Sequence, residues 1–238
     1  HLPVVESGRL VGVVSDRDLY PNEKEIALDP DAACSTRTIA ELLKGNLTTV
    51  SPEDTVVTAS VEFVMHKIGC LPVVKDEKLV GILSELDMLV AFARSWRDGL
   101  LDPDADQPPI GDLMSTHPLA ARPETSVSEA ITMCRSLGAR HLPVVDGETL
   151  VGIVSDRDLR RCASAGQAQE TTLEQVMERE PLTIGPRAPS PEAAALMATA
   201  KVSALPVVDD GRLVGILTLT DLLDHCMNAL RDPESYSA

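Results

Sequence analysis

Aromatic side chains are almost absent from this chain: its 238 residues include one Trp, two Tyr and two Phe. Because 44% of the residues are still apolar, hydrophobic cores can form, but they must be built from Val, Leu, Ile, Ala and Met. No run of 18 apolar residues occurs, which argues against a membrane-spanning helix, and nothing resembles a secretory signal peptide.

Clustered metal ligands and excess positive charge are also missing. The five cysteines include no C-x-x-C pair, so we expect reduced thiols and a cytoplasmic location rather than disulfides or a zinc site. The five histidines have no spacing typical of a metal centre. The formal net charge of −16 makes this an acidic protein that repels nucleic acid and anionic lipid, so we expect neither nucleic-acid binding nor membrane insertion. A small anionic ligand requires local basic groups or helix N-termini.

The chain contains one sequence motif that is repeated four times without insertion or deletion. In every copy a Gly follows a Pro by nine residues and an Asp follows it by fifteen; these prolines are Pro3, Pro72, Pro143 and Pro206. Three copies extend upstream to a second Pro and to a short apolar segment, IAELL, IGDLM or LEQVM. A complete unit is therefore about 50 residues long, and we expect roughly thirty further residues ahead of His1 to complete the first unit.

The third unit shows the expected local structure. Its predicted elements are a helical turn at Ile110–Met114, a brief strand at Leu119–Ala121, an amphipathic helix at Ser126–Ser136, a hairpin of Leu142–Val145 and Leu150–Val154, and a helix from Ser155 to about Cys162. The order β-α-β-β-α indicates an α/β (α+β) fold. Such a unit cannot bury both faces of its sheet alone, so units should pair. Copies one and three share SDRD, which favours pairing the first with the second and the third with the fourth.

We expect four repeats and one linker. Their predicted ranges are 1–19 for unit 1 (its C-terminal half only), 39–95 for unit 2, 96–109 for the linker, 110–163 for unit 3 and 172–230 for unit 4.

Over almost the whole chain, these repeats resemble CBS domains, the cystathionine-β-synthase-type regulatory repeats. The resemblance implies tandem repeats paired into two Bateman modules, whose clefts bind adenosine-containing ligands such as AMP, ADP or ATP. It implies a regulatory protein that needs no cofactor, in which two modules stack into a disc or two chains form a homodimer, with a regulated partner protein as the further possibility. Many relatives are regions of longer enzymes or transporters.

The family's ligand signature, G-h-h-[S/T]-x-x-[D/N], occurs in every copy. Its hydroxyl and carboxyl residues here are Ser15 and Asp18, Ser84 and Asp87, Ser155 and Asp158, and Thr218 and Asp221. A hydroxyl and a carboxylate at a helix N-terminus can bind a ribose diol, and the N–H groups of that terminus favour a phosphate. The same pattern is also a helix capping box, which needs no ligand.

Basic residues beside the motif favour unit 3 as the binding site, with unit 1 second. Arg17 and Arg157 precede the motif Asp, while His1 and the pair Arg140–His141 precede Leu-Pro. The forked donors of Arg suit a phosphate, although pairing with surface carboxylates is the alternative. Units 2 and 4 lack such residues and would need basic groups from a partner unit. The resemblance places the adenine against the second strand and the strand before the upstream Pro, where Thr49, Ala121 and Thr183 are candidates. The alternative is that these residues are simply part of the core.

Three functions are compatible with this sequence. The first is a non-catalytic sensor that binds an adenosine phosphate between paired repeats. The second is an interaction or oligomerisation scaffold whose motifs serve only as caps. The third is the regulatory region of a longer enzyme or transporter. No Ser-His-Asp or Cys-His arrangement has a spacing that supports catalysis, so the chain is not expected to be an enzyme.

Overall fold

The computed structural model describes residues 1–19, 38–43, 47–66, 68–98 and 107–231, with the backbone alone at 16–17, 96–97 and 229–231. Unit 1 contains β1 (Leu2–Glu6), β2 (Arg9–Val14) and a 3-10 helix, η1 (Asp16–Leu19). Unit 2 contains α2 (Ile39–Leu42), α3 (Val56–His66), β3 (Cys70–Lys75), β4 (Lys78–Ser84) and α4 (Glu85–Arg97). Unit 3 contains α5 (Ile110–Leu113), β5 (Ser115–Thr116), α6 (Val127–Leu137), β6 (His141–Asp146), β7 (Thr149–Ser155) and α7 (Asp156–Ser164). Unit 4 contains α8 (Leu173–Val176), β8 (Glu178–Arg179), α9 (Ser190–Ala200), β9 (Ala204–Asp209), β10 (Arg212–Thr218) and α10 (Leu219–Arg231).

Each unit is built around an antiparallel hairpin. The LPVV stretch forms its first strand and the LVG stretch its second, so that β6 pairs with β7 from His141 opposite Ser155 to Asp146 opposite Thr149. In unit 4 the two turn residues, Asp210 and Gly211, both have positive φ, as the tight hairpin turn requires. The hairpin predicted for unit 3 is therefore confirmed.

The strand predicted at Leu119–Ala121 is shorter than expected. Ala121 forms a single parallel bridge to Val144, and Val50 and Ile184 do the same in units 2 and 4. The chain turns immediately afterwards, where the Thr125 amide donates to the carbonyl of Arg122 at 3.1 Å. This turn limits the strand to one pair.

The paired units form two sheets. One has the strand order β1-β2-β4-β3; the other has the order β5-β10-β7-β6, with β8 paired to β7 and β9 to β10. Unit 1 therefore shares a sheet with unit 2, and unit 3 with unit 4, as the sequence predicted. We call these pairs module 1–2 and module 3–4.

Within a module the units exchange their upstream segments. In module 3–4, β5 of unit 3 pairs with β10 of unit 4, and β8 of unit 4 pairs with β7 of unit 3. The strands can approach because each receiving strand has a Gly: a Cβ on Gly152 would lie 2.5 Å from the Sδ of Met177 and 2.9 Å from the carbonyl oxygen of Glu178. Met114 covers Gly215 in the same way, and Leu43 covers Gly12.

β4 differs from the other three receiving strands. A Cβ on Gly81 would meet nothing nearer than Val73, at 3.7 Å. Its neighbours Val80 and Ile82 are exposed to 56% and 44%. No described residue covers this strand as Met177 covers β7.

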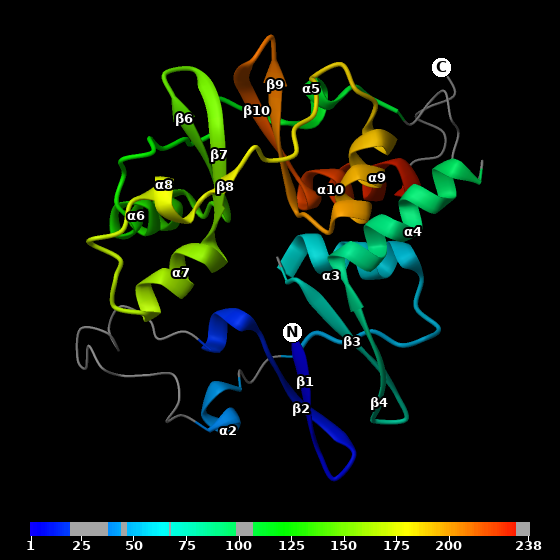
Figure 1. The fold of residues 1–238 in the computed structure, drawn as a ribbon. Coiled ribbons are helices and arrows are strands. Elements are labelled where there is room, and N and C mark those ends of the chain that lie inside the picture. Colours follow the sequence, from blue (N-terminus) through cyan, green and yellow to red (C-terminus); the bar gives the residue numbers. More distant parts are fainter. Residues whose placement is uncertain (20–37, 44–46, 67, 99–106, 232–238) are drawn as a thin grey trace.

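The two modules meet through helices of units 2 and 4. α4 packs on α9 and α10, and α10 also packs on α3. One apolar cluster therefore spans both units; its largest fully buried side chains are Phe63, Leu71, Met88, Leu89, Ile110, Met197, Leu205, Leu217 and Leu222. Unit 3 has a separate core around Leu142 and Leu159. Figure 1 shows the four units around a common centre in the order 1, 2, 4, 3, with the N-terminus near the middle.

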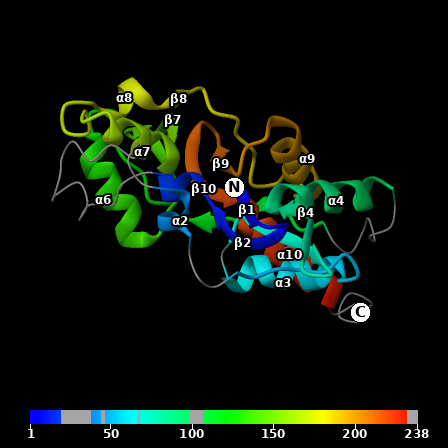
Figure 2. The same cartoon turned by 90° about the horizontal axis from the view of Figure 1, so that it is seen from below.

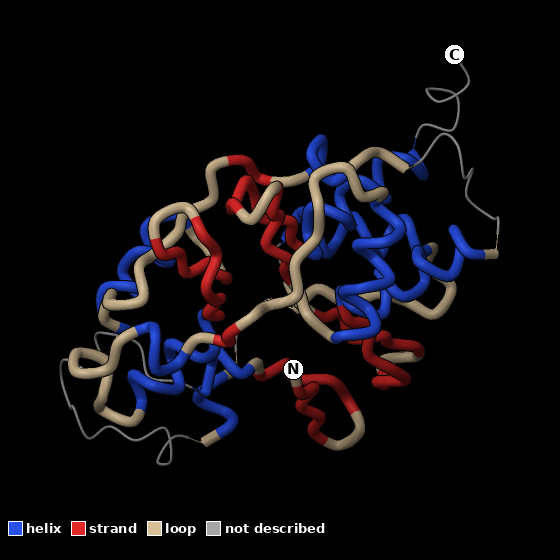
Figure 3. Tube along the Cα trace, turned by 45° about the horizontal axis from the view of Figure 1, so that its top comes forward, coloured by secondary structure: helices blue, strands red, loops and turns tan. Residues whose placement is uncertain are grey.

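The views from other sides agree with this arrangement. Figure 2 shows the molecule from below as a flattened body. Figure 3 shows the helices in two groups, one on each side of the molecule, with strands between them. Within the described ranges, no helix has both the length and the hydrophobicity needed to cross a bilayer.

The buried thiol of Cys134 gives a first testable prediction. Burial against the core of unit 3, and secondarily the charge of Asp156, raise the pKa of Cys134 to about 11. The reactive thiolate is thus scarce at pH 8, and the side chain is only 2% exposed. Cys162 is half-buried. We expect iodoacetamide at pH 8 to alkylate Cys162 at least about tenfold faster than Cys134 in the folded protein. Peptide mass spectrometry would measure this difference, which should vanish in denaturant.

Candidate functional site

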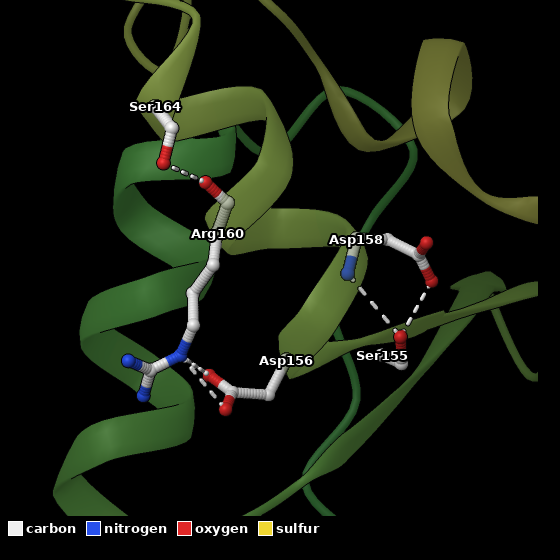
Figure 4. Close-up of polar contacts among 5 residues, drawn as sticks. All are labelled: Ser155, Asp156, Asp158, Arg160 and Ser164. Atoms are coloured by element: carbon white, nitrogen blue, oxygen red, sulfur yellow. Dashed lines mark hydrogen bonds and ion pairs between the residues drawn. The ribbon is translucent and has the colours of Figure 1, made fainter. Parts of the chain in front are cut away.

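The Ser-x-x-Asp motif of unit 3 forms a helix cap at the start of α7. Ser155 Oγ donates to Asp158 Oδ2 at 2.5 Å and accepts the Asp158 amide at 3.3 Å (Figure 4). Equivalent bonds close the caps of Ser15 with Asp18, Ser84 with Asp87 and Thr218 with Asp221. The capping interpretation is therefore confirmed in all four copies.

The cap leaves Asp158 with further acceptor capacity. It engages Oδ2, while Oδ1 lies 3.7 Å from Arg161 Nη2. Because an ionised carboxylate has about four lone-pair positions, Asp158 can cap α7 and still accept a bond from a ligand hydroxyl. Capping and ligand binding are thus compatible in this geometry.

A cavity of about 740 Å³ lies where all four units meet. The positions that precede Leu-Pro line it in every copy: His1, Gly69 and Cys70, Arg140 and His141, and Ser203 and Ala204. The motif residues at its wall are Ser15, Asp18, Ser84, Ser155 and Asp158. Its volume lies in the range of small-molecule sites. The resemblance to CBS domains implied separate clefts within the modules, whereas the structure has one cavity between all four units. We call it the central cavity.

Contacts across the central cavity connect the units. His1 of unit 1 lies against Gly69 of unit 2, and His141 Nε2 of unit 3 lies 3.1 Å from Ser203 Oγ of unit 4. Arg140 Nη1 lies 3.7 Å from Glu85 Oε2, which joins unit 3 to unit 2 and thereby one module to the other.

Both cationic and anionic groups line the central cavity. Arg160 Nε donates to both carboxylate oxygens of Asp156 at 2.9 Å, four residues earlier on α7 (Figure 4). The other charged lining residues are Asp18, Glu85, Arg140, Arg157, Asp158, Glu178 and Lys201. An incoming anion would compete with Asp156 for Arg160 and with Glu85 for Arg140.

Most, but not all, of the predicted site residues reach this cavity. Those that line it are His1, Ser15, Asp18, Ser84, Arg140, His141, Ser155, Arg157 and Asp158. Asp87, Thr218 and Asp221 lie in the caps of α4 and α10 and are not lining residues. Ala121 is 5% exposed and belongs to the core of unit 3, while Thr49 and Thr183 are exposed and are not lining residues. The side chain of Arg17 lies outside the described part of the structure.

Several lining residues were missed by the sequence analysis. The charged ones are Glu85, Asp156, Arg160, Glu178 and Lys201, and the apolar ones include Leu47, Ile68 and Val202. Glu85 and Asp156 follow the motif hydroxyl directly, a signal that could have identified them. Lys201 and Glu178 have no such signal, because only the meeting of different units brings them to one wall.

A second cleft of about 670 Å³ lies beside α7 and α8. Its lining residues are Asp158, Arg161, Cys162, Ala165, Gln167, Glu170, Thr171, Gln175 and Val176. Asp158 therefore borders both this cleft and the central cavity. In the described part of the chain, no group of three or more His, Cys, Asp or Glu is arranged to hold a metal ion.

The family model of the CBS domain matches residues 1–21, 39–94, 110–165 and 173–228. The chain belongs to the CBS domain family. Its repeats are thus CBS repeats, and the two modules are Bateman modules.

Other proteins are similar to this chain over all or part of its length. Uncharacterized protein MJ1225 of Methanocaldococcus jannaschii is 28% identical over 250 residues, covering 94% of this chain and 86% of that protein. Its crystal structure has a TM-score of 0.77 at 22% identity and covers 94% of this chain and 87% of that one, which shows the same fold. The CBS domain-containing protein YhcV of Bacillus subtilis is 31% identical over 121 residues, 51% of this chain and 81% of YhcV.

An enzyme also contains a matching region. Inosine-5'-monophosphate dehydrogenase of Korarchaeum cryptofilum is 29% identical over 209 residues, which cover 87% of this chain and 39% of the dehydrogenase.

Proposed function

We propose that this CBS protein is a non-catalytic regulatory sensor that binds an adenosine phosphate, AMP, ADP or ATP, at unit 3. The observation that carries the proposal is the convergence of Arg140, His141 and Arg157 with the Ser155–Asp158 motif at one cavity wall. In a chain with a net charge of −16, such a local group of basic residues is the feature that an anionic ligand requires.

The phosphate would bind at the basic residues. Arg140 offers forked donors that suit phosphate oxygens, and the amide groups at the N-terminus of α7 add a favourable field. His141 lies within hydrogen-bonding distance of Ser203, so unit 4 holds its ring in place. In this arrangement the phosphate points to the centre, where the modules meet.

The ribose and adenine would occupy the rest of the site. Asp158 borders both the central cavity and the outer cleft, so a ribose diol at Asp158 would sit between the two spaces. Aliphatic side chains provide the surface for a base; Ile153 lines the central cavity and Val176 lines the outer cleft. Membership of the CBS family supports the choice of adenosine as the nucleoside.

Regulation would come from the position of the site between modules. Because the central cavity is lined by both modules, a ligand at unit 3 also touches unit 2. Its binding shifts the equilibrium between two arrangements of the modules if its affinity for them differs. A homodimer or a separate regulated protein would transmit this change, as the family resemblance predicts. Cys70, Cys134 and Cys162 are free thiols, which supports the proposed cytoplasmic location.

Calorimetric titration with AMP, ADP and ATP tests this function, with Asp158→Ala and Asp221→Ala as a matched pair. Both variants lose a helix cap, at a cost of about 0.5–2 kcal/mol in unfolding free energy, but Asp221 does not line the cavity. We expect Asp158→Ala to weaken nucleotide binding at least about tenfold and Asp221→Ala by less than about twofold. Equal losses in both variants, or no binding by folded wild-type protein, would support the scaffold instead.

A second candidate is the regulatory region of a longer enzyme. The match to 39% of inosine-5'-monophosphate dehydrogenase favours it, because similar repeats occur there within a longer enzyme chain. The mass of the intact polypeptide from its native source separates the two: a mass near that of this chain plus roughly thirty residues supports the separate sensor.

A further inference from the structure

The ion pair between Arg140 and Glu85 is the starting point. It joins the residue before His141 in unit 3 to the first residue of α4 in unit 2. Nη1 and Oε2 are 3.7 Å apart, and the side chains are 36% exposed for Arg140 and 15% for Glu85. The carboxylate of Glu85, in module 1–2, therefore faces Arg140, in module 3–4. Arg140 is a residue that the proposed function assigns to the phosphate of the ligand.

Glu85 differs from its counterpart in unit 3. Asp156 occupies the equivalent position, after the motif hydroxyl, and pairs with Arg160 four residues later on the same helix. Four residues after Glu85 stands Leu89, which is fully buried in the core shared by units 2 and 4. Glu85 has no arginine at that position of its own helix, and its carboxylate lies instead beside Arg140 of unit 3.

We infer that Glu85 competes with the phosphate of a ligand for Arg140, so that phosphate binding at unit 3 releases a contact between the modules. The inference rests on the proposed function. Glu85 holds Arg140 where a ligand's phosphate would bind, so a ligand must replace one anion by another. A phosphate with two charges and three acceptor oxygens competes well with a carboxylate for a guanidinium, whereas a neutral nucleoside cannot compete.

The same exchange connects binding to the modules. When a phosphate takes Arg140, the bond that Glu85 makes across the central cavity is released. The two modules then lose this polar link and keep their apolar contact between units 2 and 4. A phosphorylated ligand thus changes the contact between modules, and an unphosphorylated one leaves it intact.

Glu85→Gln tests this inference, with Glu178→Gln as the control. Both substitutions remove one negative charge from the cavity wall and keep the side-chain volume, but Glu85 is the partner of Arg140. The probes are AMP and adenosine, titrated calorimetrically into protein whose fold is verified by circular dichroism. We expect Glu85→Gln to tighten AMP binding about fivefold and to leave adenosine binding unchanged. Glu178→Gln should change AMP binding less than about twofold.

The effect of Glu85→Gln on AMP binding should depend on Arg140. In an Arg140→Gln background, Glu85→Gln should bring no further gain for AMP, because the competed guanidinium is absent. Equal gains in Glu85→Gln and Glu178→Gln, or an equal gain for adenosine, would overturn the inference while the proposed function stands. Absence of AMP binding in the wild type and in both single variants would instead overturn the proposed function.

Discussion

Phe92→Ala is expected to lower the free energy of unfolding by about 3–5 kcal/mol, the range for truncation of a fully buried aromatic side chain. Phe92 lies on α4, is 3% exposed and belongs to the apolar cluster that spans units 2 and 4. The cavity left behind would open in the contact between modules, since α4 packs on helices of unit 4. Urea unfolding followed by circular dichroism would measure the loss.

The control for this prediction is an exposed apolar residue on a helix. Leu137, at the end of α6, is 68% exposed, so Leu137→Ala should change stability by no more than about 0.5 kcal/mol. A loss below about 1 kcal/mol for Phe92→Ala would mean that units 2 and 4 do not share a packed core.

Gly152→Ala is expected to destabilise the protein by about 1–3 kcal/mol, whereas Gly81→Ala should be neutral or stabilising by about 0.5 kcal/mol. The two glycines occupy the same repeat position. A Cβ on Gly152 would meet the Met177 side chain and, at 2.9 Å, the backbone oxygen of Glu178. The thioether can move, but the backbone oxygen is held by the pairing of β8 with β7. Gly81 has no such neighbour.

Thermal and urea unfolding of the two alanine variants would test this pair directly. Gly152→Ala should also impair nucleotide binding, because β7 leads into Ser155 at the cavity wall. Equal stability losses at both positions would show that the strand itself, not the covering segment, requires glycine.

The local structure of each unit was predictable because the sequence patterns that indicate it lie within the unit. The Pro-to-Gly spacing indicates the hairpin, and a hydroxyl three residues before an Asp indicates the cap, in agreement with Ser155 and Asp158. The pairing of units within modules was also predictable, since alternating copies share the SDRD sequence.

The contacts between modules were not predicted, although one signal for them exists. Leu89 and Leu223 occupy the same repeat position in units 2 and 4 and are fully buried, while unit 3 has Arg160 there. Arg160 marks a face of α7 that does not enter the core shared by units 2 and 4. The pair of Arg140 and Glu85 depends on how two modules meet, and no spacing within one unit contains that information.

The exchange of upstream segments has a consequence for synthesis of the chain on the ribosome. Met114 leaves the ribosome well before its place on β10 exists, whereas β7 is made before Met177, the residue that covers it. Unit 3 therefore cannot complete its fold while it is the newest part of the nascent chain, whereas Met114 and β7 already exist when unit 4 is made. The smallest piece that could be produced alone with both strands covered is the whole of module 3–4, and cutting between α7 and α8 would leave β7 without its cover.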